Sequence, residues 1–360
     1  PAVTPVPRDL PLPLPLPEGV IASLLIVFFL VHILFVNLMV GGSILIVVAE
    51  WRGLWEKRWD QLAHGIAKTV TVNKSLAVVM GIGPLLCFNL LYTIQWYSAN
   101  ALTGHAWLLI IPLVTVAFLL TYLHKYTWDR WSGGTAKSLH LAIGVAAALL
   151  FLFIPLIFLA NVNLMLFPGE WEKVRGFFSS LRIGNILPRY LHFMTASIAM
   201  TGLFLAGWFG RASSDLSSLE GFTRPGLRRI FYQVAAWLTV TQFVYGPILL
   251  FTLPSVGLTK QLYVIIVFGA LVGALTLLLL FKELRRDDSS IGRSYFGICF
   301  LFTIVVLSMG SGRHVYREAA LATHKGEIRE RTERYAAALA EFNRHLVENP
   351  PSEAQTPDQL

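Results

Sequence analysis

Long apolar runs are the feature that most restricts what this chain can fold into. A hydrocarbon core about 30 Å thick requires about 20 apolar helical residues to cross it. Hydrophobic residues make up 55% of the 360 positions and charged residues only 14%, more apolar surface than a soluble domain can bury. We therefore predict an all-α, polytopic membrane protein with about eight transmembrane helices. The predicted spans cover residues 20–50, 72–98, 105–128, 137–165, 188–211, 229–253, 261–283 and 292–314.

Composition divides the chain into three parts. Residues 1–18 are rich in proline, which predicts an extended segment outside the membrane. Residues 19–315 form the predicted membrane domain. Residues 316–360 are rich in Ala, Glu and Arg, with acid–base pairs at helical spacing over most of their length. This predicts a helical tail outside the membrane, either a docking surface for a soluble partner or a merely solvated helix.

Positive charge marks one side of the predicted bundle. Lys and Arg gather in the loops after the first, third, fifth and seventh spans, and short loops rich in these residues stay on the cytoplasmic side. Both termini are therefore expected on the outer side. The net charge of +8 follows from these loops, so it does not indicate a nucleic-acid partner. The two cysteines, Cys87 and Cys299, lie in apolar runs, and the absence of a CxxCH motif excludes covalent haem attachment by that motif.

Histidines provide the candidate chemistry. Ionisable groups inside a membrane are expensive, so those that occur there carry a functional hypothesis. Four of the nine histidines fall in the outer half of the bilayer or at its edge, whereas the spans contain almost no carboxylates. Neutral imidazole on the facing helices of a bundle is a common axial ligand of b-type haem. The predicted haem-iron ligands are His32, His192 and His314, with His105 as a further candidate.

Other side chains leave alternatives open. His124 and His140 form a second pair near the inner surface, as interfacial residues or as ligands of a further haem. Met309, five residues before His314, is either a soft iron ligand or a packing residue. For a lone membrane histidine, the competing interpretation is a hydrogen-bonded structural residue.

Several stretches resemble subunit I of the cytochrome bd quinol oxidases, in order and spacing over about 210 residues. Residues 31–51 (VHILFVNLMVGGSILIVVAEW) resemble the family's first span, with its haem-ligating histidine and, eighteen residues later, a glutamate, here His32 and Glu50. Residues 67–83, 126–131 (YTWDRW) and 157–169 are similar to later elements of that subunit. Residues 187–208 resemble the fifth span, where His192 matches the axial histidine of the low-spin haem b.

The chain also departs from that family. The methionine expected at the start of the seventh span is absent from residues 261–273, and the quinol-binding loop is reduced to residues 253–260. The third span lacks the family's acids, and His314 stands near the place of a haem-ligating glutamate. The soluble tail replaces the last span. Imidazoles without an acidic proton relay favour electron transfer through closed haems over oxygen reduction.

Together these features predict a haem b membrane subunit of a respiratory-chain oxidoreductase, with two or more haems. It is expected to move electrons between membrane quinol or quinone and a separate c-type cytochrome subunit on the outer side, beside further membrane subunits. The resemblance implies the bacterial inner membrane, with both termini periplasmic. Two alternatives are a bd-like terminal oxidase subunit that reduces oxygen and a haem-free membrane anchor for a periplasmic enzyme.

Overall fold

The computed structural model describes residues 14–183 and 185–348, with only the backbone described for residues 71–75. Residues 1–13 of the predicted extended segment and residues 349–360 of the predicted tail lie outside the described residues. Helices account for every regular element in the described ranges. They are α1 (Glu18–Gly53), α2 (Lys57–Leu91), α3 (Thr93–Thr103), α4 (His105–Tyr126), α5 (Gly134–Leu166), η1 (Pro168–Lys173), α6 (Phe177–Ser180), α7 (Ile186–Gly210), α8 (Arg224–Thr252), η2 (Ser255–Gly257), α9 (Lys260–Leu284) and α10 (Tyr295–Glu348).

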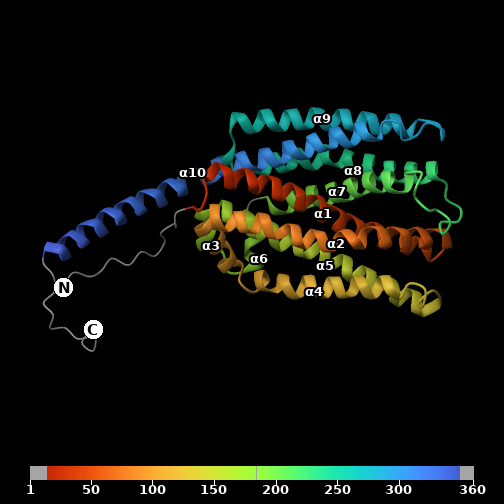
Figure 1. Cartoon of the computed structure of the whole chain (residues 1–360), viewed down its shortest axis with the longest axis horizontal. Coiled ribbons are helices and arrows are strands. Elements are labelled where there is room, and N and C mark those ends of the chain that lie inside the picture. Colours follow the sequence, from red (N-terminus) through yellow and green to blue (C-terminus); the bar gives the residue numbers. More distant parts are fainter. Residues whose placement is uncertain (1–13, 184, 349–360) are drawn as a thin grey trace.

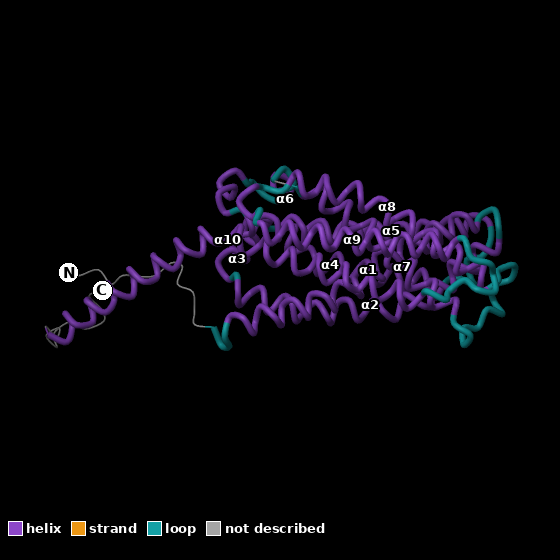
Figure 2. Tube along the Cα trace, turned by 90° about the horizontal axis from the view of Figure 1, so that it is seen from above, coloured by secondary structure: helices purple, strands orange, loops and turns teal. Residues whose placement is uncertain are grey.

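The long helices lie side by side as one elongated bundle (Figures 1 and 2). Seven described helices are long and apolar enough to cross a membrane, and the number is eight if the bent pair Leu76–Leu91 and Thr93–Thr103 counts as one span. The protein is thus a polytopic helical membrane protein, as predicted. We call the end from which α10 projects the tail end, and the end with the loops 54–56, 127–133, 211–223 and 285–294 the basic end (Figure 1).

The second predicted span, residues 72–98, is wrong in its last third. The chain turns by 112° between Leu91 and Thr93, so α3 departs from the direction of α2. The turn is held by Tyr92, which is 1% exposed. Its hydroxyl contacts the Glu318 carboxylate and accepts a hydrogen bond from Arg317 Nε at 2.9 Å. An apolar count does not detect such a turn, because the residues on both sides of it are apolar.

Small residues bring α1 and α7 close together. A Cβ added at Gly41 of α1 would stand 2.4 Å from the Ser197 carbonyl oxygen of α7. At the same level, Ser197 Oγ donates to Asn37 Oδ1 at 2.8 Å, and Thr201 Oγ1 donates to the Asn37 carbonyl at 3.0 Å. Close approach through small residues with hydrogen bonds between helices is a common way of packing helices in lipid. The Asn37–Ser197 contact therefore fixes the relative height of α1 and α7.

The tail helix continues the last span without a break. The sequence predicts a span at 292–314 followed by a separate helix, whereas α10 is one helix of 54 residues. Its first half packs against α9, and its second half leaves the bundle at the tail end (Figure 1). Leu321 is the last of its buried residues. We call residues 322–348 the projecting arm.

Candidate functional site

His32 lies on α1 against the second helix. Its Nδ1 is 2.8 Å from the Ala77 carbonyl oxygen of α2. A carbonyl oxygen only accepts hydrogen bonds, so Nδ1 carries the proton and the neutral ring keeps its lone pair on Nε2. A Cβ at Gly81 would stand 3.0 Å from the imidazole Cε1, so the α2 backbone passes beside the ring. A backbone carbonyl that fixes the tautomer in this way is typical of a metal-binding histidine.

His192 lies on α7 against α8. The side-chain N–H of Gln242 donates to His192 Nδ1 at 2.9 Å, so in the neutral ring the lone pair is on Nδ1 and the proton is on Nε2. A Cβ at Gly246 would stand 4.0 Å from the imidazole Cε1. We find no hydrogen-bond partner for Nε2 of either His192 or His32 among the residues that the structure describes. Each ring is therefore oriented through Nδ1, but only His32 presents the lone pair of Nε2. Ligation through His192 Nε2 requires the other tautomer, with the Gln242 side chain turned so that its oxygen accepts from Nδ1.

The two imidazoles stand at one level of the bundle. Asn37 of α1 contacts Ser197 of α7, and each histidine lies five residues before its contact residue, on helices that run in the same direction. Five residues correspond to a rise of about 7.5 Å and a turn of about 140° away from the contact face. His32 consequently faces α2 while His192 faces α8, and the two rings do not contact each other. This arrangement fits two separate haems better than one haem shared by both rings.

A guanidinium group stands one turn towards the tail end from each of these histidines. Arg189 is three residues before His192 on α7. Arg313 of α10 lies over the ring of Phe29, 5.0 Å from its centroid, and Phe29 is three residues before His32. Within residues 14–183 and 185–348, neither guanidinium forms an ion pair with a carboxylate. Unpaired charge is costly at a membrane helix end, so both positions favour an anionic partner.

His314 is placed differently from the other two predicted ligands. Arg317 Nη2 lies 3.0 Å from His314 Nδ1. An arginine only donates, so the His314 lone pair is on Nδ1 and the proton is on Nε2. The ring lines a cavity at the tail end between α1, α2 and α10, together with Phe29 and Phe88. Ligation of iron by His314 thus requires Arg317 to release Nδ1, and it stays a prediction.

The weaker candidates near the tail end are less enclosed. His105 is exposed as the first residue of α4. Met309 is 39% exposed, and its Cε would lie 3.2 Å from a Cβ at Gly269 of α9. Met309 thus lies along α9, and its role as an iron ligand stays a prediction.

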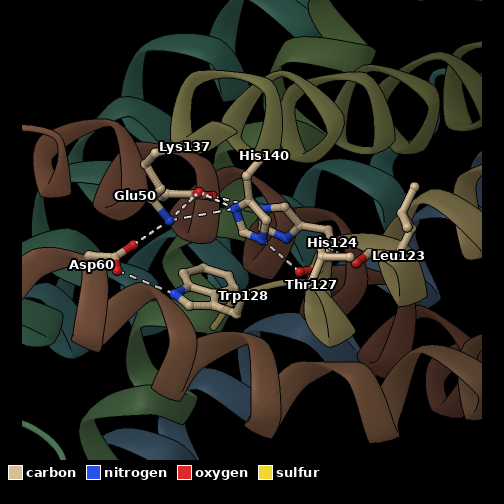
Figure 3. A network of polar contacts seen from close by, with 8 residues as sticks. All are labelled: Glu50, Asp60, Leu123, His124, Thr127, Trp128, Lys137 and His140. Atoms are coloured by element: carbon tan, nitrogen blue, oxygen red, sulfur yellow. Dashed lines mark hydrogen bonds and ion pairs between the residues drawn. The ribbon is translucent and has the colours of Figure 1, made fainter. Parts of the chain in front are cut away.

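A second polar cluster, which we call the Glu50 cluster, lies near the basic end and consists of Glu50, Asp60, His124, Lys137 and His140 (Figure 3). Glu50 and His140 are 0% exposed, and His124 is 5% exposed. Glu50 Oε2 lies 2.6 Å from His124 Nε2, and Glu50 Oε1 lies 2.5 Å from His140 Nδ1. Lys137 Nζ bridges Glu50 Oε1 at 2.7 Å and Asp60 Oδ1 at 2.6 Å.

The Glu50 cluster joins four helices, with the Glu50 carboxylate at its centre and Asp60 contributed by α2. Glu50 ends the apolar part of α1, His124 closes α4, and Lys137 and His140 share a face of α5 at i, i+3 spacing. Trp128 covers the cluster, with its Nε1 donating to Asp60 at 3.3 Å and its ring beneath Lys137 Nζ. Both ring nitrogens of His140 have protein partners, so we leave this pair out of the haem hypothesis.

The sequence indicated the two histidines of this cluster, and it indicated Glu50 only through the family resemblance and not as their acidic partner. The prediction that the spans contain almost no carboxylates holds for the middle of each span. At the span ends, the described residues include two fully buried carboxylates, those of Glu50 and Glu283. Glu283 has a structural role, because it accepts hydrogen bonds from the backbone N–H groups of Gly292 and Ser294 before α10. Part of the Glu50 cluster could be predicted from the sequence, because Lys137 and His140 are three residues apart and therefore lie on one face of a helix.

Comparison with known proteins supports the architecture. No protein-family model matches the chain, and neither does any curated protein sequence. Among solved structures, the chain is similar to the bd oxidase from Geobacillus thermodenitrificans, with a TM-score of 0.63 and 11% sequence identity. The match covers 93% of this chain and 99% of that chain. The protein therefore has a bd-oxidase-like helical fold, and the predicted resemblance is confirmed at that level.

Proposed function

We propose that this chain is a haem b-binding subunit of a membrane electron-transfer complex, with His32 and His192 as axial ligands of two haems. It would move electrons between quinol or quinone in the lipid and a c-type cytochrome on the outer side. The observation that carries the proposal is the pair of imidazoles at one level, each oriented through Nδ1. His32 presents the Nε2 lone pair directly, and His192 would present it once the Gln242 side-chain oxygen accepts from Nδ1. The bd-oxidase-like fold supports it, because the solved structure that shares this fold is that of a bd oxidase.

The surrounding residues fit haem in a second respect. Haem carries two propionates, and Arg189 and Arg313 offer guanidinium groups one turn from the two histidines without carboxylate partners among the described residues. Arg–carboxylate pairs are strong and often bidentate. Bound haem would supply reversible one-electron transfer. The protein's own contribution is to orient each imidazole through Ala77 and Gln242, and to neutralise the propionates at the tail end.

The test is a reduced-minus-oxidised spectrum with pyridine haemochrome quantification on the purified full chain. We expect about two haems b per wild-type chain and about one in each of His32→Ala and His192→Ala. His64→Ala is the matched control, because His64 is a half-buried histidine that stacks on Trp128 near the basic end. It should keep every haem. Full haem content in both ligand variants would refute the assignment.

Two further measurements separate the competing functions. Reduced protein should transfer electrons to an added soluble c-type cytochrome, and its spectrum should not change with carbon monoxide. A carbon monoxide difference spectrum would support an oxygen-reducing subunit instead. A purified chain without a Soret band would contradict haem binding and favour a haem-free membrane anchor.

A further inference from the structure

The hydrogen-bond geometry at His140 favours a cation beside its Nδ1. Its Nε2 lies 2.7 Å from the His124 carbonyl oxygen, which only accepts, so Nε2 carries a proton. Its Nδ1 lies 2.5 Å from Glu50 Oε1, and in a neutral ring this nitrogen has a lone pair. A lone pair and a carboxylate oxygen repel each other at this distance. Positive charge therefore stabilises this contact. The Lys137 ammonium lies beside both atoms, 3.5 Å from Nδ1 and 2.7 Å from Oε1, and a proton or a metal ion would fit between them.

The charges of the whole cluster also favour a cation. With neutral imidazoles, the carboxylates of Glu50 and Asp60 face the single ammonium group of Lys137, which leaves one negative charge in excess. Glu50 is 0% exposed, and an uncompensated charge at a buried position is strongly destabilising. The groups from α1, α2, α4 and α5 that face one another here do not neutralise themselves.

The side chains offer the donor set of a metal site. Ligand atoms of Glu50, His124 and His140 all lie within 4.8 Å of one another, and all three residues are buried. Two imidazoles and one carboxylate are a known zinc-binding combination that leaves a fourth position open. The hydrogen bond from His140 Nε2 to a backbone carbonyl is the outer-shell contact that metal-binding histidines usually make. A cavity beside His124, lined also by Ser43 and Thr121, leaves space for a fourth ligand.

We propose that Glu50, His124 and His140 bind one divalent transition-metal ion of the zinc class, which joins α1, α4 and α5 near the basic end. The ligand atoms are a Glu50 carboxylate oxygen, His124 Nε2 and His140 Nδ1. Metal–ligand bonds of about 2.0 Å place neighbouring ligand atoms about 3.3 Å apart, so binding widens both imidazole–carboxylate contacts. Lys137 then loses its contact with Glu50 but keeps two others. Its Nζ stays paired with Asp60 at 2.6 Å and stays over the Trp128 ring, 4.6 Å from the ring centroid.

Two neighbouring residues make the proposal specific. A Cβ at Gly144 would stand 2.7 Å from His124 Nε2, so a larger residue there displaces a ligand atom. Lys137 Nζ contacts Glu50 Oε1 at 2.7 Å and therefore competes with the metal for the carboxylate. Gly144→Ala should weaken metal binding, and Lys137→Met should strengthen it.

The experiment measures zinc bound to the purified full chain. The protein is stripped with a chelator, reloaded with Zn²⁺, dialysed and analysed by inductively coupled plasma mass spectrometry. We expect about one zinc per wild-type chain and a loss of affinity of about 100-fold or more in His124→Gln and Glu50→Gln, beyond the roughly 10–100-fold typical of outer-shell changes. His64→Gln is the matched control and should bind as the wild type does.

Lys137→Met keeps the test decisive if Glu50→Gln does not fold, because it leaves all three ligands in place and should bind zinc more tightly than the wild type. Equal zinc in the wild type and in His124→Gln would overturn the proposal. So would wild-type protein that retains no zinc after dialysis, in which case the positive charge at His140 comes from a proton or from the Lys137 ammonium.

Discussion

The close contact between α1 and α7 gives a sharp prediction for Gly41→Ala. The added Cβ would stand 2.4 Å from both the Ser197 carbonyl oxygen and Thr201 Oγ1, whereas ordinary van der Waals contact begins at 3.4 Å. One of these atoms belongs to the backbone and cannot rotate away. The other belongs to a hydroxyl that donates to Asn37 at 3.0 Å. The two helices must therefore move apart by about 1 Å at the level that also fixes His32 and His192.

The magnitude follows from two opposing effects. Overpacking a tight contact costs about 1–3 kcal/mol, and weakening the Thr201–Asn37 hydrogen bond adds about 1 kcal/mol. Replacing glycine by alanine inside a helix stabilises by about 0.5–1 kcal/mol. The expected net loss is about 1–3 kcal/mol, which lowers the unfolding midpoint by roughly 2–4 °C for each kcal/mol.

The protein carries its own reporters for this measurement. Cys87 is buried and Cys299 is half-buried, so a thiol-reactive fluorogenic dye follows thermal unfolding in detergent. Gly297→Ala is the matched control, because a Cβ there meets nothing within 4 Å, and its midpoint should equal or exceed that of the wild type. A Gly41→Ala midpoint at or above the wild-type value would refute the packing argument.

Two more predictions concern structural contacts. Glu283→Gln removes the charge from a buried carboxylate that accepts from the Ser294 N–H at 3.0 Å and pairs with Arg286 at 2.8 Å. It should lower the unfolding midpoint by the equivalent of about 1–3 kcal/mol, and an unchanged melting curve would contradict this role. Arg317→Met removes the donor to Tyr92 that holds the turn between α2 and α3. Hydrogen–deuterium exchange of Thr93–Thr103 should become faster, and identical exchange would show that the turn is held by other contacts.

The arrangement of the spans was largely predictable from the sequence, because apolar length and loop charge are local properties. The same reasoning failed at the turn after Leu91. There the chain bends by 112°, for a reason that lies more than 200 residues away, in the contacts of Tyr92 with Arg317 and Glu318. No window of local hydropathy contains that information.

The site was predictable only as a set of residue types. Histidine depth along α1 and α7 could be counted, whereas the partner of each Nδ1 could not. The carbonyl of Ala77 orients His32, and the guanidinium of Arg317 takes the lone pair of His314. Glu50 was predicted only as the glutamate that the family resemblance places after His32, and not as the partner of His124 and His140, because it stands at the end of a span, where an acid usually reaches water. Only the packing of α4 and α5 over it shows that it is buried.

The continuity of α10 has a mechanical consequence. The helix rises about 1.5 Å per residue, so the projecting arm extends about 40 Å beyond Leu321 with no hinge in its hydrogen-bonding pattern. The orientation of every face of the arm is thereby coupled to the rotation of the membrane segment below it. Inserting a single residue between the two would turn the arm by about 100°, and whatever it carries would swing around the bundle with it.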